Sequence, residues 1–361
     1  MKKKLKVAIL FGGKSAEHEI SLISARNIVD AVDKKKYEII AIGIDKQGRW
    51  HFDEGARLLR DKQQPKVEFK GTKNSAAVLP GDTATPMVRP SGAQFGAVDV
   101  VFPILHGPFG EDGTVQGLLK LANLPFVGAG VLGSAVGMDK DVMKRLLRDA
   151  KIPTPKFLAF ERSDKISFAR VKKSLGMPLF IKPANLGSSV GISKVVKPAQ
   201  FNVAVKEAFR YDKKIIIEEF IKGREIECSV LGNEKPIASL PGEIIVNRDF
   251  YSYDAKYVDA KGARLEIPAR LPKSTVRIVR ETALQAYKVL CCEGMARVDF
   301  FIQANGRVLV NEINTIPGFT KISMYPKMWE ASGISYSRLI DRLINLALSR
   351  FDHEQRLKNS K

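Results

Sequence analysis

The segment 297–314 predicts a β-hairpin that places two acidic side chains opposite each other. Its first half reads RVDFFI, and its side chains alternate in direction as in a β-strand with one buried face. Asn305-Gly306 predicts a two-residue type I′ turn, because both central residues of that turn need a positive φ. Counting outward from this turn sets Asp299 opposite Glu312. The sequence therefore predicts an antiparallel hairpin with a pair of carboxylates on one face.

The two opposed carboxylates are predicted to bind a divalent cation. Directly opposed side chains have Cβ atoms roughly 4.5–5.5 Å apart, and like charges at that distance destabilise a sheet. The same register sets Arg297 opposite Asn314, whose amide adds an oxygen, and hard oxygen ligands suit Mg²⁺ or Mn²⁺. A surface hairpin with solvated acids is the alternative, and a one-residue bulge would separate the acids. The apolar opposite face favours a buried sheet instead; it comprises Val298, Phe300, Val308 and Val310.

The composition indicates a globular protein without a membrane segment. The chain has 361 residues, enough for two or three domains, and its 45% hydrophobic and 27% charged content is ordinary. No apolar run approaches the ~20 residues of a membrane span. After the basic start MKKK, only the short apolar run Val7–Phe11 precedes Gly12-Gly13, which predicts a buried strand rather than a signal peptide. Three cysteines without a CxxC pair fit a reducing cytosol, so we expect a cytoplasmic protein with no disulfide or zinc site.

The net charge of +20 comes from 59 Lys+Arg against 39 Asp+Glu. A field of this size could attract nucleic acid. The basic residues are scattered, however, and the few aromatic residues do not interleave with them as in a base-stacking surface. We therefore predict a generally basic surface with a few lysines for an anionic ligand, and no specific nucleic-acid site.

The N-terminal segment predicts the start of a parallel α/β unit. A buried strand over Leu5–Phe11, a helix over Glu17–Val32 and a strand over Tyr37–Ile44 follow one another. The turn GGKSAEHE is not GxGxxG, which argues against a dinucleotide-binding fingerprint. It nevertheless places Glu17 at a helix N-terminus above the strand ends, where open sheets bind ligands.

A second glycine-rich loop follows the predicted strand Val98–Leu105. It reads HGPFGEDGTVQG and leads into a predicted helix over Thr114–Ala122. His106 at a strand end beside glycines favours contact with a ligand over a role as a core histidine. The first domain is predicted to end near Gly128–Gly133, and no role is assigned to the weakly patterned insertion 47–94.

A third glycine-rich loop lies between two predicted strands. The strand PLFIKP, the loop NLGSSVGIS and a returning strand lack the GxxxxGK[ST] pattern of a P-loop. The loop's backbone N–H groups and hydroxyls could hold phosphates, with Lys182 as counter-charge, although a plain flexible hairpin has the same pattern. The aperiodic stretch Asn247–Ala269 predicts a lid loop. Further strands are predicted over Lys214–Phe220 and Glu225–Leu231, and helices over Lys273–Leu290 and Tyr336–Arg350.

These motifs together resemble the D-alanine–D-alanine ligases of the ATP-grasp superfamily. They are FGGKSAEHEISL, LHGPFGEDGTVQG, MDK, IKPANLGSSVGISK, YDAKY, RVDFF and NEINTIPGFT, in this order over nearly the full length. The resemblance implies a three-domain α/β ATP-grasp fold. We expect an N-terminal parallel α/β domain at 1–130, a small central α+β domain with the glycine loop at 131–220, and a C-terminal α+β domain with an antiparallel sheet at 221–361.

The resemblance also implies a reaction. ATP would phosphorylate the carboxylate of one D-alanine, and the amine of a second would attack the acyl phosphate. The tetrahedral intermediate would then collapse to the dipeptide with release of phosphate, for peptidoglycan precursor synthesis. The implied cofactors and partners are ATP, two Mg²⁺ or Mn²⁺ ions, D-alanine and a second copy of the chain in a homodimer.

Family roles for the nucleotide can be carried onto matching positions. Asp299, Glu312 and Asn314 would hold the metal ions. Lys140, Lys182 and Ser189 would contact phosphates, Glu218 would lie at the adenine, and Glu225 at the ribose. Lys256 would reach the transferring phosphate.

Family roles for the amino acids can be carried over in the same way. Glu17 would bind the ammonium group of the first substrate, with His106 nearby. Ser188, Tyr257 and Glu17 would form a hydrogen-bonded triad that closes the lid. Arg297 and the backbone N–H of Gly318 would form an oxyanion hole. Ser323 and the backbone of Met324 would bind the carboxylate of the second substrate.

Three other functions remain open at this stage. Another ATP-grasp carboxylate–amine ligase would share the hairpin but lack SAEHE and YDAKY. A depsipeptide-forming relative from vancomycin resistance would differ in the lid at Tyr257. A non-enzymatic nucleic-acid-binding protein would not need the acid pair beside Arg297.

Overall fold

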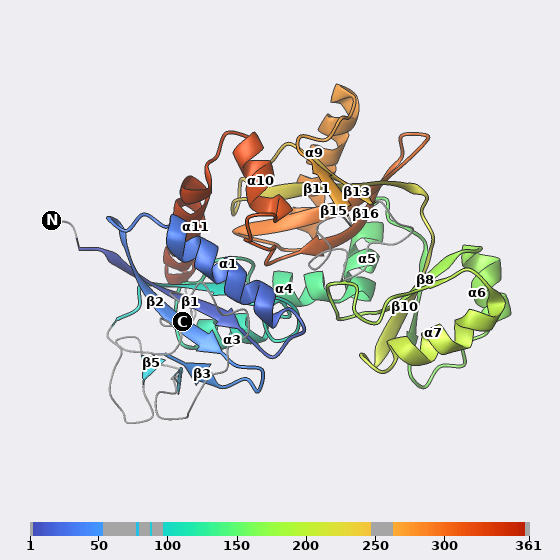
Figure 1. Cartoon of the computed structure of the whole chain (residues 1–361), viewed down its shortest axis with the longest axis horizontal. Helices are drawn as coiled ribbons and strands as arrows, with labels where there is room; N and C mark the ends of the chain where they lie inside the picture. The colour runs from blue at the N-terminus through green and yellow to red at the C-terminus, as the bar shows by residue number, and fades with distance from the viewer. Residues whose placement is uncertain (1–2, 53–76, 79–86, 89–96, 247–262, 358–361) are drawn as a thin grey trace.

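The computed structural model describes residues 3–52, 77–78, 87–88, 97–246 and 263–357 (Figure 1). Three β-sheets form the framework, and each has helices packed against it. One small separate sheet pairs β4 (Ala77–Val78) with β5 (Met87–Val88). Among the described residues, no helix is both long and apolar enough to cross a membrane.

The N-terminal sheet is mostly parallel, as the sequence predicted. Its strand order is β3-β2-β1-β6, and β1 pairs in parallel with both β2 and β6. Side chains on one face of β1 pack against helices α1 and α11, and those on the other face pack against α3. The elements are β1 (Leu5–Gly12), α1 (His18–Ala31), β2 (Tyr37–Ile44), β3 (Trp50–His51), β6 (Val100–Ile104), α3 (Thr114–Leu121) and α11 (Tyr336–Gln355).

The central sheet is antiparallel and stands apart from the rest of the molecule, on the right in Figure 1. Its strand order is β7-β10-β8-β9, and α6 and α7 pack against one of its faces. Four of its elements, β7, α6, η1 and α7, were not predicted from the sequence. The elements are β7 (Phe157–Glu161), α6 (Phe168–Leu175), β8 (Leu179–Pro183), β9 (Ser193–Val195), the 3₁₀ turn η1 (Pro198–Gln200), α7 (Phe201–Ala208) and β10 (Lys214–Glu219).

The C-terminal sheet is also antiparallel, with the order β14-β13-β11-β15-β16 and β12 beside β11. Helices α5 and α9 pack against one face and share its apolar core, while α10 packs against β13 on the other. The elements are α4 (Val131–Met138), α5 (Lys140–Asp149), β11 (Gly223–Leu231), β12 (Ile237–Ala238), β13 (Gly242–Val246), β14 (Ala263–Glu266), α9 (Lys273–Val289), β15 (Met295–Gln303), β16 (Val308–Asn314) and α10 (Met324–Ala331).

The hydrophobic cores do not follow the order of the chain. Met143 and Leu147 of α5 belong to the core of the C-terminal sheet, although α5 precedes the whole central sheet. Likewise Tyr325 and Trp329 of α10 belong to the core that contains the N-terminal sheet. The central sheet is therefore an inserted body, and the predicted domain boundaries at 130 and 220 stay predictions.

Candidate active site

The predicted pairing of the acids is confirmed, but the predicted turn is wrong. Asp299 lies opposite Glu312, and Arg297 lies opposite Asn314. The loop contains residues 304–306 rather than two residues, because the N–H of Gln303 donates to the carbonyl of Arg307 at 3.0 Å. Only Gly306 of this loop has a positive φ, 80°, whereas a type I′ turn needs two such residues.

A bulge in β16 compensates for the extra loop residue. The pairing shifts between Asp299 and Phe300, so that Asn311 has no partner residue on β15. The N–H of Val310 donates to the carbonyl of Pro153 at 2.8 Å, and the carbonyl of Asn311 accepts from the Lys144 ammonium at 2.9 Å. The bulge therefore has partners outside the sheet, and it returns both acids to one face.

The acid pair is embedded in matched charges. Arg297 donates to both oxygens of Asp299 at 2.7 Å, and its Nε lies 3.0 Å from Glu227. Burial disfavours the guanidinium, but the attraction of Asp299 and Glu227 outweighs burial and raises the pKa of Arg297 well above its ordinary value. The amide nitrogen of Asn314 donates to Asp299 at 2.9 Å. The Glu312 carboxylate is 3.9 Å from the Lys140 ammonium.

These residues fit a hard divalent cation that is shared with a ligand. The register brings together two carboxylates and one amide oxygen, which are the donor types that Mg²⁺ and Mn²⁺ prefer. Within the described ranges no group of three His, Cys, Asp or Glu side chains forms a cluster that could hold a metal by itself. A cation held here would therefore take further ligands from solvent or from a bound molecule.

A buried lysine pair flanks this site. The Glu218 carboxylate lies 2.8 Å from Lys144 and 2.5 Å from Lys182. Burial opposes ionisation of Glu218, but the two ammonium groups outweigh it and lower its pKa to about 2. Burial lowers the pKa of Lys144, whereas at Lys182 the attraction of Glu218 and Glu312 outweighs burial and raises the pKa. Glu225 also contributes to the raised pKa of Lys182, so this charge lies nearby.

Lys144 was missed by the sequence analysis. It follows Lys140 by four residues, so both lysines lie on one face of α5. Asp139 caps this helix by accepting from the N–H groups of Asp141 and Val142. The spacing K-x-x-x-K directly after a capping aspartate was visible in the sequence and could have pointed to the second lysine.

The glycine loop joins the central sheet to the N-terminal domain. The Ser188 hydroxyl donates a hydrogen bond to the carboxylate of Glu17, and the Lys140 ammonium donates one to the carbonyl of Leu186 in the same loop. Ser188 and Ser189 both have a positive φ, 50° and 60°, which non-glycine residues rarely adopt. The structure thus brings together two members of the predicted triad, while Tyr257 and the neighbouring Lys256 lie outside the described residues.

His106 is buried and has a protein partner at each ring nitrogen. Nδ1 lies 3.0 Å from the carbonyl of Ile316, and Nε2 lies 3.4 Å from the hydroxyl of Ser24. A neutral ring with the proton on Nδ1 satisfies both contacts. Burial lowers the pKa of His106, which agrees with a neutral ring at pH 7. His106 therefore fixes the loop at Ile316, and its predicted contact with a ligand stays a prediction.

Glu111 is a second residue that the sequence analysis did not assign to the site. Its carboxyl accepts from the N–H groups of Gly107 at 2.6 Å and Ile316 at 3.1 Å. Burial, with a further contribution from the charge of Glu17, raises the pKa of Glu111 to about 8. Glu111 is thus mainly protonated at neutral pH. The sequence signal was its place in the glycine-rich loop, five residues after His106.

The loop before α10 is tightly held at Gly318 and Ser323. A Cβ added at Gly318 would lie 2.8 Å from the Ser323 hydroxyl oxygen, so the close approach requires glycine. The Ser323 hydroxyl accepts from the N–H of Thr320 at 2.9 Å. Ser323 directly precedes α10, which begins at Met324, and helix N-termini favour anions. Gly318, Ser323 and Met324 therefore lie on one segment, while Arg297, the other residue of the predicted oxyanion hole, lies on β15.

The parallel unit and two antiparallel sheets make up a three-domain ATP-grasp fold, which defines the class of the protein. A sequence profile described as "D-ala D-ala ligase N-terminus" matches residues 6–129, and one described as "D-ala D-ala ligase C-terminus" matches residues 146–345. The D-alanine--D-alanine ligase of Oceanobacillus iheyensis is 54% identical over 362 residues, which cover 99% of each chain. D-alanine--D-alanine ligase A of Salmonella typhimurium is 52% identical over 361 residues, again 99% of each chain.

Solved structures agree with these sequence matches. The D-alanine-D-alanine ligase from Coxiella burnetii has a TM-score of 0.87 and 44% identity, covering 98% of this chain and 96% of its own. VanG D-Ala:D-Ser ligase from Enterococcus faecalis has a TM-score of 0.85 and 37% identity, covering 96% of this chain and 100% of its own. The chain belongs to the D-alanine–D-alanine ligase family.

Proposed function

We propose that this protein joins two D-alanines to D-alanyl-D-alanine with ATP, through an acyl phosphate, and releases ADP and phosphate. The observation that carries the proposal is the hairpin register, which sets Asp299 opposite Glu312 beside Arg297 in a chain of this family. The family's relatives of 52–54% identity bear the name of this dipeptide-forming ligase. The product is a precursor for peptidoglycan.

The nucleotide is proposed to lie between the central and C-terminal sheets. Lys140, Lys182 and Ser189 bind its phosphates, Glu218 lies at the adenine and Glu225 at the ribose. Asp299, Glu312 and Asn314 would hold two Mg²⁺ or Mn²⁺ ions, which when bound neutralise the charge on the phosphates. Support comes from the oxygen donors on one sheet face and from the buried lysines that converge on Glu218.

The first D-alanine is proposed to bind at the N-terminal domain. Glu17 holds its ammonium group, and His106 keeps the surrounding loop in place through Ile316. Ser188 ties the glycine loop to Glu17, and with Tyr257 it closes the lid so that water is excluded from the acyl phosphate. The contact between Ser188 and Glu17 and the bond of His106 to Ile316 support this placement.

The second D-alanine is proposed to bind beside the loop that precedes α10. Ser323 and the N–H of Met324 bind its carboxylate, and its amine attacks the acyl phosphate. Arg297 and the N–H of Gly318 stabilise the oxyanion of the tetrahedral intermediate, because these donors are fixed before charge develops. Lys256 contacts the phosphate that is transferred.

We further propose that the protein acts as a homodimer in the cytoplasm and has no specific nucleic-acid partner. The scattered basic residues support the last point, since no aromatic side chains interleave with them in the sequence. Sedimentation would establish the number of subunits. A salt series with duplex DNA would test the absence of a specific nucleic-acid site, because a site that contacts Z phosphates gives a slope of about −0.9Z when log K is plotted against log salt concentration.

The decisive experiment measures phosphate release from ATP with D-alanine, L-alanine, and D-alanine in combination with D-lactate or D-serine. We expect turnover with D-alanine alone and the dipeptide as the main product by mass spectrometry. A preference for D-lactate or D-serine as second substrate would assign a different product to this chain. Absence of ATP consumption with every amino acid would refute the proposed reaction.

A further inference from the structure

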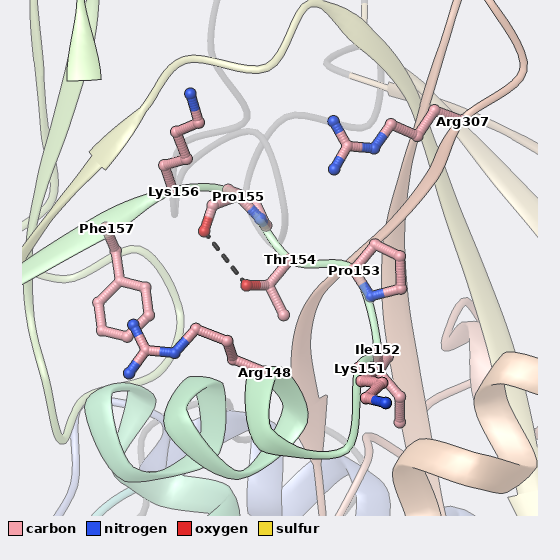
Figure 2. A pocket seen from close by; sticks show the side chains of 9 residues that line it. All are labelled: Arg148, Lys151, Ile152, Pro153, Thr154, Pro155, Lys156, Phe157 and Arg307. Carbon is pink, nitrogen blue, oxygen red and sulfur yellow. Dashed lines mark hydrogen bonds between the residues drawn. The ribbon is translucent and has the colours of Figure 1, made fainter. Parts of the chain in front are cut away.

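A hollow of about 430 Å³ lies between the end of α5, the start of β7 and the turn that joins β15 to β16. Figure 2 shows three cationic side chains around it: Arg148 from α5 with its guanidinium beside the Phe157 ring, Lys156 just before β7, and Arg307 just before β16. Lys151 also lines it, and Pro153 and Phe157 give it an apolar part. We call this group of residues the hinge pocket. None of its residues has a part in the proposed reaction.

The four cations of the hinge pocket form no ion pair in the described part of the chain. This differs from their neighbours, because Arg145 on the same helix pairs with Asp141 at 2.6 Å and Lys214 pairs with Asp139 at 2.6 Å. The Arg148 guanidinium instead lies 6.0 Å from the centre of the Phe157 ring. Unpaired like charges around one hollow repel each other, and an anion that binds there relieves the repulsion.

The hinge pocket lies where the central sheet joins the rest of the protein. The chain enters the central sheet through residues 151–156 and leaves it through residues 220–222. These connections run side by side: the Lys156 N–H donates to the Glu219 carboxylate at 2.7 Å, and the Glu219 N–H donates to the Lys156 carbonyl at 3.0 Å. The carbonyl of Pro153 accepts a hydrogen bond from the N–H of Val310 in the acid-bearing hairpin. Arg148 and Arg307 thus belong to the C-terminal body, and Lys156 to the central one.

We propose that the hinge pocket is a binding site for a multiply charged phosphate anion, which links the central sheet to the C-terminal sheet. The cations that line the hollow come from separate elements, and a tetrahedral phosphate presents oxygens in several directions, whereas a carboxylate presents two oxygens in one plane. Two of the four cations are arginines, whose planar donors match phosphate oxygens. The volume suits a diphosphate or a small phosphate ester rather than a folded partner. Bound there, the anion holds the central sheet in one orientation over the nucleotide site.

The test uses pyrophosphate as the probe. Binding is measured by titration calorimetry at low salt, with a saturating non-hydrolysable ATP analogue and excess Mg²⁺ so that the nucleotide site is filled. The hinge variant carries Arg148→Gln, Lys156→Gln and Arg307→Gln. A control variant removes the same charges from exposed positions elsewhere, with Arg170→Gln, Lys172→Gln and Arg338→Gln.

We expect one pyrophosphate to bind to the unchanged protein and to the control variant, and to bind at least tenfold more weakly to the hinge variant. Hydrogen exchange in segments 153–157 and 219–223 should slow on binding in the first two proteins alone. Equal binding by the hinge and control variants, or no binding by the unchanged protein, would overturn the proposal. If the triple variant does not fold, Arg307→Gln alone replaces it, because its side chain is exposed on a turn. The binding readout does not depend on turnover, so it can fail while the proposed reaction stands.

Discussion

The acid pair of the hairpin and the hinge pocket are close in the chain, since Arg307 directly precedes β16 and Glu312 lies within it. Their cationic side chains, however, differ in whether they have carboxylate partners. At the hairpin, Arg297 is matched by Asp299 and Glu227, and the lysines behind it are matched by Glu218. At the hinge pocket, the four cations that line the hollow have no carboxylate partner among the residues that the structure describes. Buried charges must be paired because desolvation is costly, whereas exposed cations can stay unpaired in water. The cations of the hairpin region are thus paired within the protein, whereas the exposed cations of the hinge pocket are available to the proposed anion.

The largest effect on stability is expected from removing one member of a buried ion pair. Lys144→Met leaves the Glu218 carboxylate with one ammonium group instead of two and removes the donor to the Asn311 carbonyl. Breaking a buried ion pair typically costs about 3–5 kcal/mol. We expect a loss of this size in the free energy of unfolding, measured by urea denaturation.

Lys172→Met on α6 is the matched control for this variant, because Lys172 is exposed and has no ion pair in the described chain. Its free energy of unfolding should change by less than about 0.5 kcal/mol. Equal stability of the two variants would show that the buried contacts of Lys144 with Glu218 and Asn311 do not stabilise the folded protein.

The second prediction concerns the acid that faces the proposed metal ions. Glu312→Gln keeps the shape of the side chain but removes its charge. Changing a residue that only supports metal ligands typically costs 10–100-fold, so removing a ligand should lower turnover by more than about 100-fold. Dipeptide formation with excess Mg²⁺ is the measurement, and Glu281→Gln on the exposed surface of α9 is the control. Activity of Glu312→Gln within a few-fold of the control would remove Glu312 from the metal site.

The third prediction uses Glu111, the acid at the site whose pKa is raised to about 8 by burial and by Glu17. Between its ordinary pKa of 4.5 and pH 8 the folded protein holds a proton here that the unfolded chain has lost. Stability must therefore fall as pH rises through this window, by at most about 1.4 kcal/mol per pH unit from this group.

Glu111→Gln has no proton to lose, so this part of the pH dependence should disappear. The variant has one acceptor oxygen for the two N–H groups of Gly107 and Ile316, which gives an offset that does not change with pH, so the test is the trend. Urea denaturation at pH 5, 6.5 and 8 should show the stability of the variant rising relative to that of the unchanged protein. A difference that stays constant over these pH values would contradict the raised pKa.

The smallest effect is expected at the hinge pocket. Arg307→Gln removes an exposed cation that has no ion pair with any described residue, so the free energy of unfolding should change by less than about 0.5 kcal/mol, or rise slightly as repulsion falls. Arg224→Gln is the informative comparison, since Arg224 donates to both oxygens of Glu243 at 2.7 and 2.6 Å. A larger loss for Arg307→Gln than for Arg224→Gln would show that Arg307 is already neutralised in the folded protein.

The sequence predicted the parallel N-terminal unit well because its strands are short, continuous apolar runs. It predicted much of the central sheet poorly. Helix α7 at Phe201–Ala208 has eight residues and strand β7 at Phe157–Glu161 has five, so hydrophobic periodicity has little to measure in either. Their conformation is decided by packing against Leu179 and Ile217 across the sheet, which no local pattern reports.

At the site, residues in distinctive motifs were identified and residues defined by distant contacts were not. Lys144 is positioned by an ion pair with Glu218 and a hydrogen bond to Asn311, which lie 74 and 167 residues further along the chain. Glu111 acquires its raised pKa from burial and from Glu17 in another loop. The acid pairing was predicted correctly from a wrong turn, because the unforeseen bulge at Asn311 cancelled the extra loop residue.

Because of that bulge, we expect the tip of the hairpin to accept insertions without a change in the register of the acids. The register of the acids is fixed at Asn311 and Val310, by Lys144 and Pro153, and not at residues 304–306. A peptide tag or a fluorescent reporter inserted at Asn305 would lengthen the tip without sliding one strand past the other. The same position adjoins Arg307, so a reporter there would also sense what occupies the hinge pocket.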